Sequence, residues 1–155
     1  MVTAFAGNVL LAVWTGSPPR AEDVRTCGAA MLQRAKALGR CALLVRIAPS
    51  MALPDEATRE SIQVTVRKLD PYLVCGATVI PQEGIAGTAM RAVVSTLQLL
   101  SRPKHPEKIF ATSKQAAVFL CGELERKGVP SLPVETLVAI VDELTKGAGA
   151  GSPPP

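Results

Sequence analysis

Aromatic side chains make up only 3% of this 155-residue chain, which has one Trp, one Tyr and three Phe. Proteins that bind single-stranded nucleic acid stack bases on aromatic rings, so this scarcity argues against that class of function. The net charge of +4 does not reverse the argument, because acidic residues lie between the basic ones along the chain. We therefore expect no nucleic-acid partner.

Histidine and cysteine are also scarce. The single histidine is His105, and the four cysteines are Cys27, Cys41, Cys75 and Cys121. Their spacing matches no metal site, so we expect no metal and no cofactor. Widely spaced cysteines predict buried, reduced thiols in a cytoplasmic protein. We expect His105 to be solvated in the polar loop 102–108, because no neighbouring group would orient it for catalysis.

The chain also lacks a hydrophobic run that could cross a membrane. Its most apolar helical stretch, residues 85–100, is too short and contains Arg91. The amino-terminal segment has no basic region ahead of its apolar residues, and Gly7 and Asn8 interrupt it. We expect neither a membrane span nor a secretion signal.

Short apolar runs alternate four times with segments of helical spacing. The runs are residues 8–15, 41–48, 74–80 and 108–111. This alternation predicts a small α/β domain with a four-stranded, mostly parallel sheet and flanking helices. Helix spacing, with Gly and Pro as stop signals, places the flanking helices at residues 21–38, 54–70, 85–100 and 112–128.

The α/β pattern covers residues 1–128, and a shorter helical extension follows at residues 129–147. Ser131 is the expected cap of that last helix, which should span residues 132–146. Residues 148–155 consist of Gly, Ala, Ser and Pro, and we expect this tail to be disordered.

Three segments carry a resemblance to a known family. They are Gly-Asn-Val-Leu-Leu-Ala-Val-Trp-Thr-Gly at 7–16 with Ala-Glu-Asp-Val at 21–24, Ala-Leu-Leu-Val at 42–45, and Lys-Ile-Phe-Ala-Thr-Ser-Lys-Gln-Ala-Ala-Val-Phe-Leu at 108–120. The layout of residues 5–125 resembles the STAS family of anti-sigma-factor antagonists. It is more similar to the stand-alone bacterial STAS-like branch related to CRAL-TRIO lipid-transfer domains. The resemblance implies a STAS-like fold, with regulatory protein binding or lipid binding as its activity.

Phosphorylatable STAS proteins carry a switch serine within an Asp-Ser-Ser/Thr-Gly stretch, between the second core strand and the next helix. The corresponding segment here, residues 48–55, offers only Ser50, without the neighbouring Asp and Gly. A phosphate at this position would change the local charge strongly. Ser50 is therefore a possible phosphorylation switch, and the alternative is an ordinary turn residue.

The segment 85–100 has a wider apolar arc than a surface helix normally hides. This excess predicts a non-enzymatic, regulatory interaction module that binds a protein partner or forms a homodimer. The residues expected at the contact are Met90, Arg91, Val94 and Leu97. The alternative is that the chain's own carboxy-terminal helix covers the arc.

A second hypothesis is a carrier or sensor of a small hydrophobic ligand, because a core of small side chains can leave a cavity. The turn containing Gly84, Gly87 and Thr88 opens a helix and could hold an anion on free backbone N–H groups. A tight turn explains the same glycines. An enzyme is the third hypothesis, and it would need a cleft that joins His105, Cys121 or the Gly84 turn.

Overall fold

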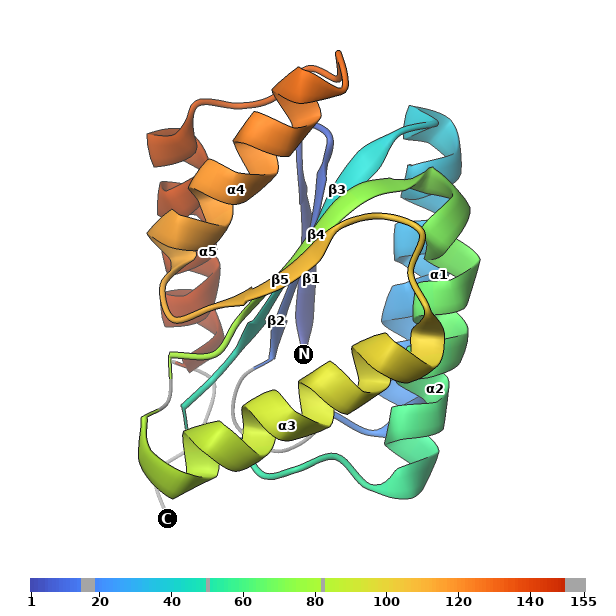
Figure 1. Ribbon diagram of the computed structural model, residues 1–155, viewed down its shortest axis with the longest axis vertical. Helices are drawn as coiled ribbons and strands as arrows, with labels where there is room; N and C mark the ends of the chain where they lie inside the picture. Colours follow the sequence, from blue (N-terminus) through green and yellow to red (C-terminus); the bar gives the residue numbers. More distant parts are fainter. Residues whose placement is uncertain (15–18, 50, 82, 150–155) are drawn as a thin grey trace.

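The computed structural model describes residues 1–14, 19–49, 51–81 and 83–149. Five strands form one sheet in the order β1-β2-β3-β4-β5, and only β1 runs antiparallel to its neighbour (Figure 1). The strands are β1 (Val2–Ala6), β2 (Val9–Trp14), β3 (Cys41–Ile47), β4 (Leu73–Val79) and β5 (Glu107–Phe110). The α/β class is confirmed, and the expected number of four strands is wrong by one.

The additional strand, β1, forms a hairpin with β2. Ala6 pairs with Val9 across the two-residue connection Gly7–Asn8, and Gly7 has a φ of +57°. This left-handed backbone conformation is typical of two-residue hairpin turns, where Gly and Asn are favoured. Gly7 and Asn8 therefore join two strands rather than opening the first one.

Five helices cover the two faces of the sheet (Figure 1). One face carries α1 (Ala21–Leu38), α2 (Glu56–Leu69) and α3 (Gly84–Ser101), and the other carries α4 (Ser113–Arg126) and α5 (Val134–Gly149). A single 3₁₀ turn, η1 (Asp70–Tyr72), links α2 to β4. The disordered tail was expected from residue 148, but α5 extends to Gly149, and residues 150–155 lie outside the described residues.

The helix ends follow the local sequence at most positions. Asp55 accepts a hydrogen bond from the Thr58 backbone N–H at 2.8 Å. Hydrogen bonding by the side chain and the backbone of Thr58 holds the pKa of the Asp55 carboxyl below its ordinary value. Thr112 caps α4 as expected, because its hydroxyl accepts from the Gln115 N–H. The expected cap at Ser131 is wrong, since its hydroxyl donates to Glu125 and α5 begins at Val134.

The sheet separates two hydrophobic cores. The first core lies under α4 and α5 and includes Leu11, Leu44, Leu120 and Leu137. The second lies under α1 and α2 and reaches Met90 of α3. Because α5 packs on the first face, the carboxy-terminal helix does not cover α3, and that alternative from the sequence is wrong.

Candidate functional site

A cavity of about 80 Å³ lies between α3, α2 and the second face of the sheet, and we call it the α3 cavity. Its walls are mostly aliphatic. They comprise Trp14, Leu43, Val45, Ile47 and Thr78 from the strands, Pro54, Ile62 and Val66 from α2 and its approach, Met90, Val93, Val94, Leu97, Gln98 and Ser101 from α3, and Glu107 from β5. An apolar pocket with a few polar groups is the usual form of a small-molecule site.

A second cavity, of about 60 Å³, lies between α1, α2 and the same face of the sheet. It shares five wall residues with the α3 cavity, namely Trp14, Leu43, Val45, Ile62 and Val66. One layer of side chains therefore separates the two spaces.

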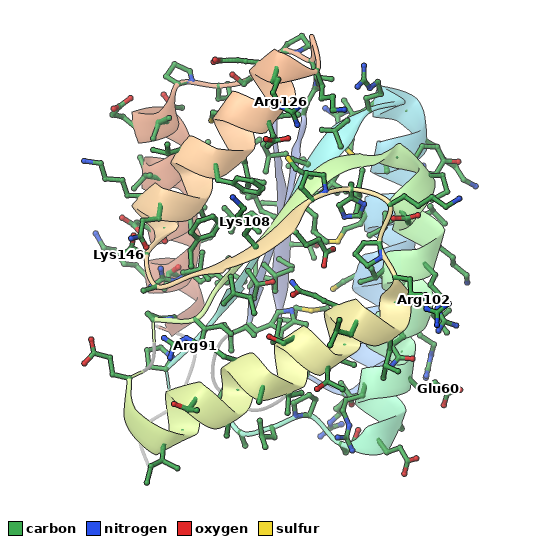
Figure 2. The ribbon with its side chains drawn as sticks, in the orientation of Figure 1. Glu60, Arg91, Arg102, Lys108, Arg126 and Lys146 are labelled. Carbon is green, nitrogen blue, oxygen red and sulfur yellow. The ribbon has the colours of Figure 1, made fainter. Side chains whose placement is uncertain are left out.

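Helix α3 covers its cavity loosely. Of its 18 residues only Gly87 and Met90 are buried, while Val94 and Leu97 line the cavity and remain half-buried. One Nη of Arg91 (Figure 2) donates a hydrogen bond to the carbonyl of Ile80 at 3.0 Å. This bond holds α3 next to the carboxyl end of β4. The cavity is therefore accessible from solvent along the helix.

Among the described residues of the cavity wall, one buried polar atom lacks a hydrogen bond. Trp14 is only 8% exposed, and its indole N–H has no partner in the described part of the chain. Leaving a buried donor unpaired costs about 1 to 3 kcal/mol, so this donor is one of the exceptions that require an explanation.

The other polar groups of the cavity lie where α3 ends and β5 begins. Gln98 and Ser101 belong to the last turns of α3, and Glu107 is the first residue of β5. Among the described lining residues Glu107 is the only one with a charge. The cavity therefore has an acidic polar end within aliphatic walls.

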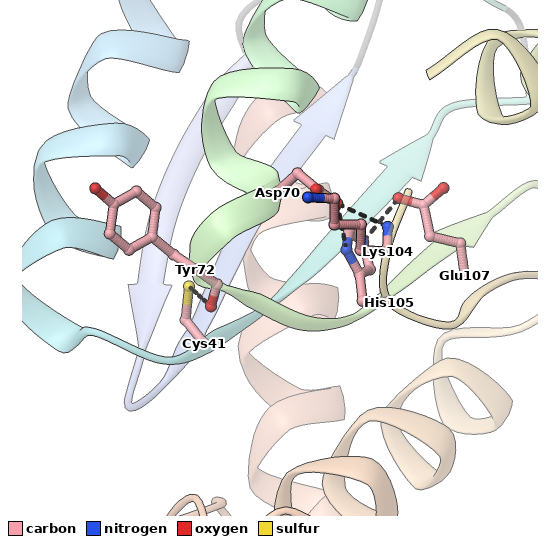
Figure 3. Close-up of polar contacts among 6 residues, drawn as sticks. All are labelled: Cys41, Asp70, Tyr72, Lys104, His105 and Glu107. Atoms are coloured by element: carbon pink, nitrogen blue, oxygen red, sulfur yellow. Dashed lines mark hydrogen bonds and ion pairs between the residues drawn. The ribbon is translucent and has the colours of Figure 1, made fainter. Parts of the chain in front are cut away.

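Glu107 belongs to a cluster centred on His105. The two ring nitrogens of His105 lie 3.0 Å from Asp70 Oδ1 and 3.1 Å from Glu107 Oε1 (Figure 3). Asp70 Oδ1 also accepts the backbone N–H of Lys104 at 3.0 Å. His105 is only 8% exposed, so the expectation of a solvated loop histidine is wrong.

A glycine in the neighbouring strand makes room for the Glu107 side chain. Gly76 lies opposite Glu107 in the register of β4 and β5. A Cβ at position 76 would lie 3.1 Å from Glu107 Cγ and 3.2 Å from Oε1, which is closer than ordinary contact. Glu107 can therefore lie flat across the sheet and reach both His105 and the cavity.

The residues expected at a protein contact do not all face solvent. Met90 is 2% exposed and belongs to the second core, while Val94 and Leu97 line the α3 cavity. Met90 is therefore wrong as a contact residue. Arg91 is half-buried and bonded to the Ile80 carbonyl.

The outward side of α3 carries a different set of apolar residues. Ile85 is 92% exposed, Leu99 76% and Leu100 56%. Single exposed apolar residues are common on proteins, but several on one helix form a candidate binding surface.

The turn proposed for anion binding forms the first turn of α3. Gly84 has a φ of +71°, and Gly87 is buried. The Thr88 hydroxyl donates to the Gly84 carbonyl at 3.0 Å, so its proton is used within the helix. Ser50, the possible phosphorylation site, lies outside the described residues.

The thiols are free, and three of the four are buried. Burial raises the pKa of Cys41 to about 11 and that of Cys75 to about 12, and it also raises the pKa of Cys121. These three thiols therefore stay protonated at neutral pH and are poor nucleophiles. Cys27 is half-buried on α1 and lines the second cavity.

We expect a disulfide reagent such as DTNB to modify Cys27 alone in the native protein, because the other thiols are buried and protonated. Absorbance of the released thiolate at pH 8 measures the reaction. The C27S variant should then show almost no native reaction, and all thiols should react in denaturant. Rapid reaction of a second thiol in the native protein would contradict the burial described here.

No family model, curated protein or solved structure matches this chain. Within the described residues, none of the helices combines the length and apolarity that a membrane crossing requires. The same part of the chain contains no group of three or more His, Cys, Asp or Glu side chains arranged to hold a metal ion. Asp70 and Glu107 bind opposite nitrogens of His105, so their oxygens do not converge on one point.

Proposed function

We propose that this protein binds a small, largely apolar molecule in the α3 cavity and acts as a non-enzymatic carrier or sensor. The observation that carries the proposal is the aliphatic cavity under the loosely packed α3. A cavity of about 150 Å³ with aliphatic and aromatic walls can bind benzene, and the α3 cavity is smaller but accessible along the helix. It therefore suits a compact ligand, or part of a longer one.

The single tryptophan allows a direct test. Because Trp14 lines the α3 cavity, a bound molecule should change its fluorescence. We expect titration with hexanol to give a saturable change, with an affinity that calorimetry reproduces. Native mass spectrometry of protein purified from its own cells should also reveal a retained small molecule.

A variant that fills the cavity sharpens the test. Val94 is half-buried and lines the cavity, so V94F should occupy the space and weaken hexanol binding at least tenfold. The matched control is V118F, since Val118 is 54% exposed on α4 at the opposite face of the sheet. Unsaturable fluorescence changes, or equal hexanol binding by both variants, would contradict the proposal.

The outer face of α3 favours a second function, which is docking on a protein partner or on a second copy of the chain. The exposed side chains of Ile85, Leu99 and Leu100 support it, because they lie outside both hydrophobic cores. We expect L99E to reduce self-association measured by light scattering coupled to size exclusion, without altering the far-UV circular dichroism. A wild-type protein that stays monomeric at high concentration would exclude the homodimer.

A further inference from the structure

The polar end of the α3 cavity carries a defined charge. Glu107 is the only charged residue in the cavity wall among the described residues. None of the described lining residues is Lys or Arg, so a ligand carboxylate or phosphate would find no cation among them and would lie beside a carboxylate. Like charges at close range are unfavourable, and more so away from bulk water.

The neighbours of Glu107 do not cancel its charge. The cluster contains two carboxylates, on Asp70 and Glu107, and the single imidazole of His105 can carry at most one positive charge. The cluster therefore keeps a net negative charge. The side chains of Asp70 and Glu107 are 16% and 12% exposed, so bulk water screens this charge only in part.

One oxygen of Glu107 is available to a ligand. Glu107 Oε1 lies 3.1 Å from His105 Nε2, whereas Oε2 has no hydrogen bond to the described residues. In Figure 3 the second carboxylate oxygen of Glu107 points away from His105. Gln98 and Ser101 line the same cavity, and their side chains carry an amide oxygen and a hydroxyl that can accept hydrogen bonds.

We infer that the ligand of the α3 cavity is a small primary amine whose ammonium group meets Glu107 and whose apolar body lies among the aliphatic walls. This inference rests on the proposed function, since it names the chemical class that the same cavity takes. An ammonium group offers three donors and a positive charge. Glu107 Oε2, Gln98 and Ser101 offer acceptors at the end of the cavity, and the aliphatic remainder excludes a second charged group.

Three probes that share one apolar body test the inference: hexylamine, hexanol and hexanoate. We expect the wild-type protein to bind hexylamine about tenfold more tightly than hexanol, because hydrogen bonds between charged groups are stronger than neutral ones. Hexanoate should bind more weakly than hexanol. Trp14 fluorescence and calorimetry at pH 7 measure all three affinities.

Two variants assign the preference to Glu107. In E107Q the carboxylate becomes an amide of the same size, and hexylamine affinity should fall to about that of hexanol measured on the same variant. The control E135Q removes an exposed carboxylate of α5 on the opposite face and should change nothing. Q98E leaves the His105 cluster intact and adds a carboxylate to the cavity wall, so it should tighten hexylamine binding even if E107Q folds poorly.

The outcomes separate this inference from the proposed function. If the three probes bind equally, or hexanoate binds best, the cavity binds apolar molecules and the amine assignment is overturned. An unchanged hexylamine preference in folded E107Q overturns it as well. If none of the probes binds, the proposed function fails and the inference fails with it.

Discussion

Replacement of His105 by alanine is expected to lower the free energy of unfolding by about 3 kcal/mol, because it removes the partner of two poorly exposed carboxylates. His105 is 8% exposed and joins Asp70 at the end of α2 to Glu107 at the start of β5. Without the imidazole, the two acids lose their hydrogen bonds to His105 and face each other across the vacated space. Urea denaturation followed by circular dichroism measures the change.

A neighbouring residue is the control. Lys104 is exposed, and only its backbone N–H contacts Asp70, so K104A should leave the stability within about 0.5 kcal/mol of wild type. A double-mutant cycle then tests the mechanism, since the loss caused by H105A should be smaller in an E107Q background. An unfolding midpoint of H105A equal to that of K104A would show that the cluster contributes nothing to stability.

Ligand binding by H105A gives an independent result. Removal of His105 frees Glu107 Oε1, so both carboxylate oxygens can face the α3 cavity. We therefore expect the less stable variant to keep or strengthen its preference for hexylamine, provided that the measurement is made well below its unfolding midpoint. Stability and amine recognition would then depend on the same cluster in opposite ways.

The inner strands and all five helices could be predicted from the sequence, because each is an apolar or periodic segment bounded by Gly or Pro. Helix α1 (Ala21–Leu38) matches its predicted bounds. The strand that the prediction omitted, β1, is an edge strand in which only Ala6 is buried. Its signal was the Gly7–Asn8 pair between two apolar runs, which indicates a hairpin turn as well as a strand start.

The position of the site was only partly predictable. The wide apolar arc of residues 85–100 correctly marked α3 as unusual, since most of its apolar side chains lie outside the cores. Helical spacing tells which residues share a side, but it does not tell which side meets the sheet. Met90, Val94 and Leu97 therefore could not be assigned to the inner side, nor Ile85 and Leu99 to the outer one, without the fold.

The His105 cluster depended on information that single segments do not contain. Asp70 lies just before β4, and His105 lies just before β5. Since β4 and β5 are parallel neighbours, the amino ends of both strands meet at one edge of the sheet. Once that pairing is known, the proximity of Asp70 and His105 follows, and Gly76 inside β4 indicates the close approach of another side chain.

The second large effect is expected on the opposite face of the sheet. L137A should lower the free energy of unfolding by about 3 kcal/mol, because it leaves a cavity in a fully buried part of the core. Leu137 is 0% exposed and belongs to the core formed by α4, α5 and the sheet. The control is T136A, since Thr136 precedes it on α5 and is exposed.

A truncated chain tests whether residues 129–147 are a dispensable extension of the domain. Helix α5 covers β1 and β2 and packs against α4, so its loss would expose Leu11 and Leu120, which are fully buried. We therefore expect a chain that ends at Gly128 to lose cooperative unfolding, measured by urea denaturation. An L137A protein as stable as T136A would instead show that the Leu137 side chain contributes little to the first core. The α3 cavity lies across the sheet from Leu137, so folded L137A should bind hexanol with wild-type affinity. A weakened affinity would mean that the two faces are coupled through the strands they share.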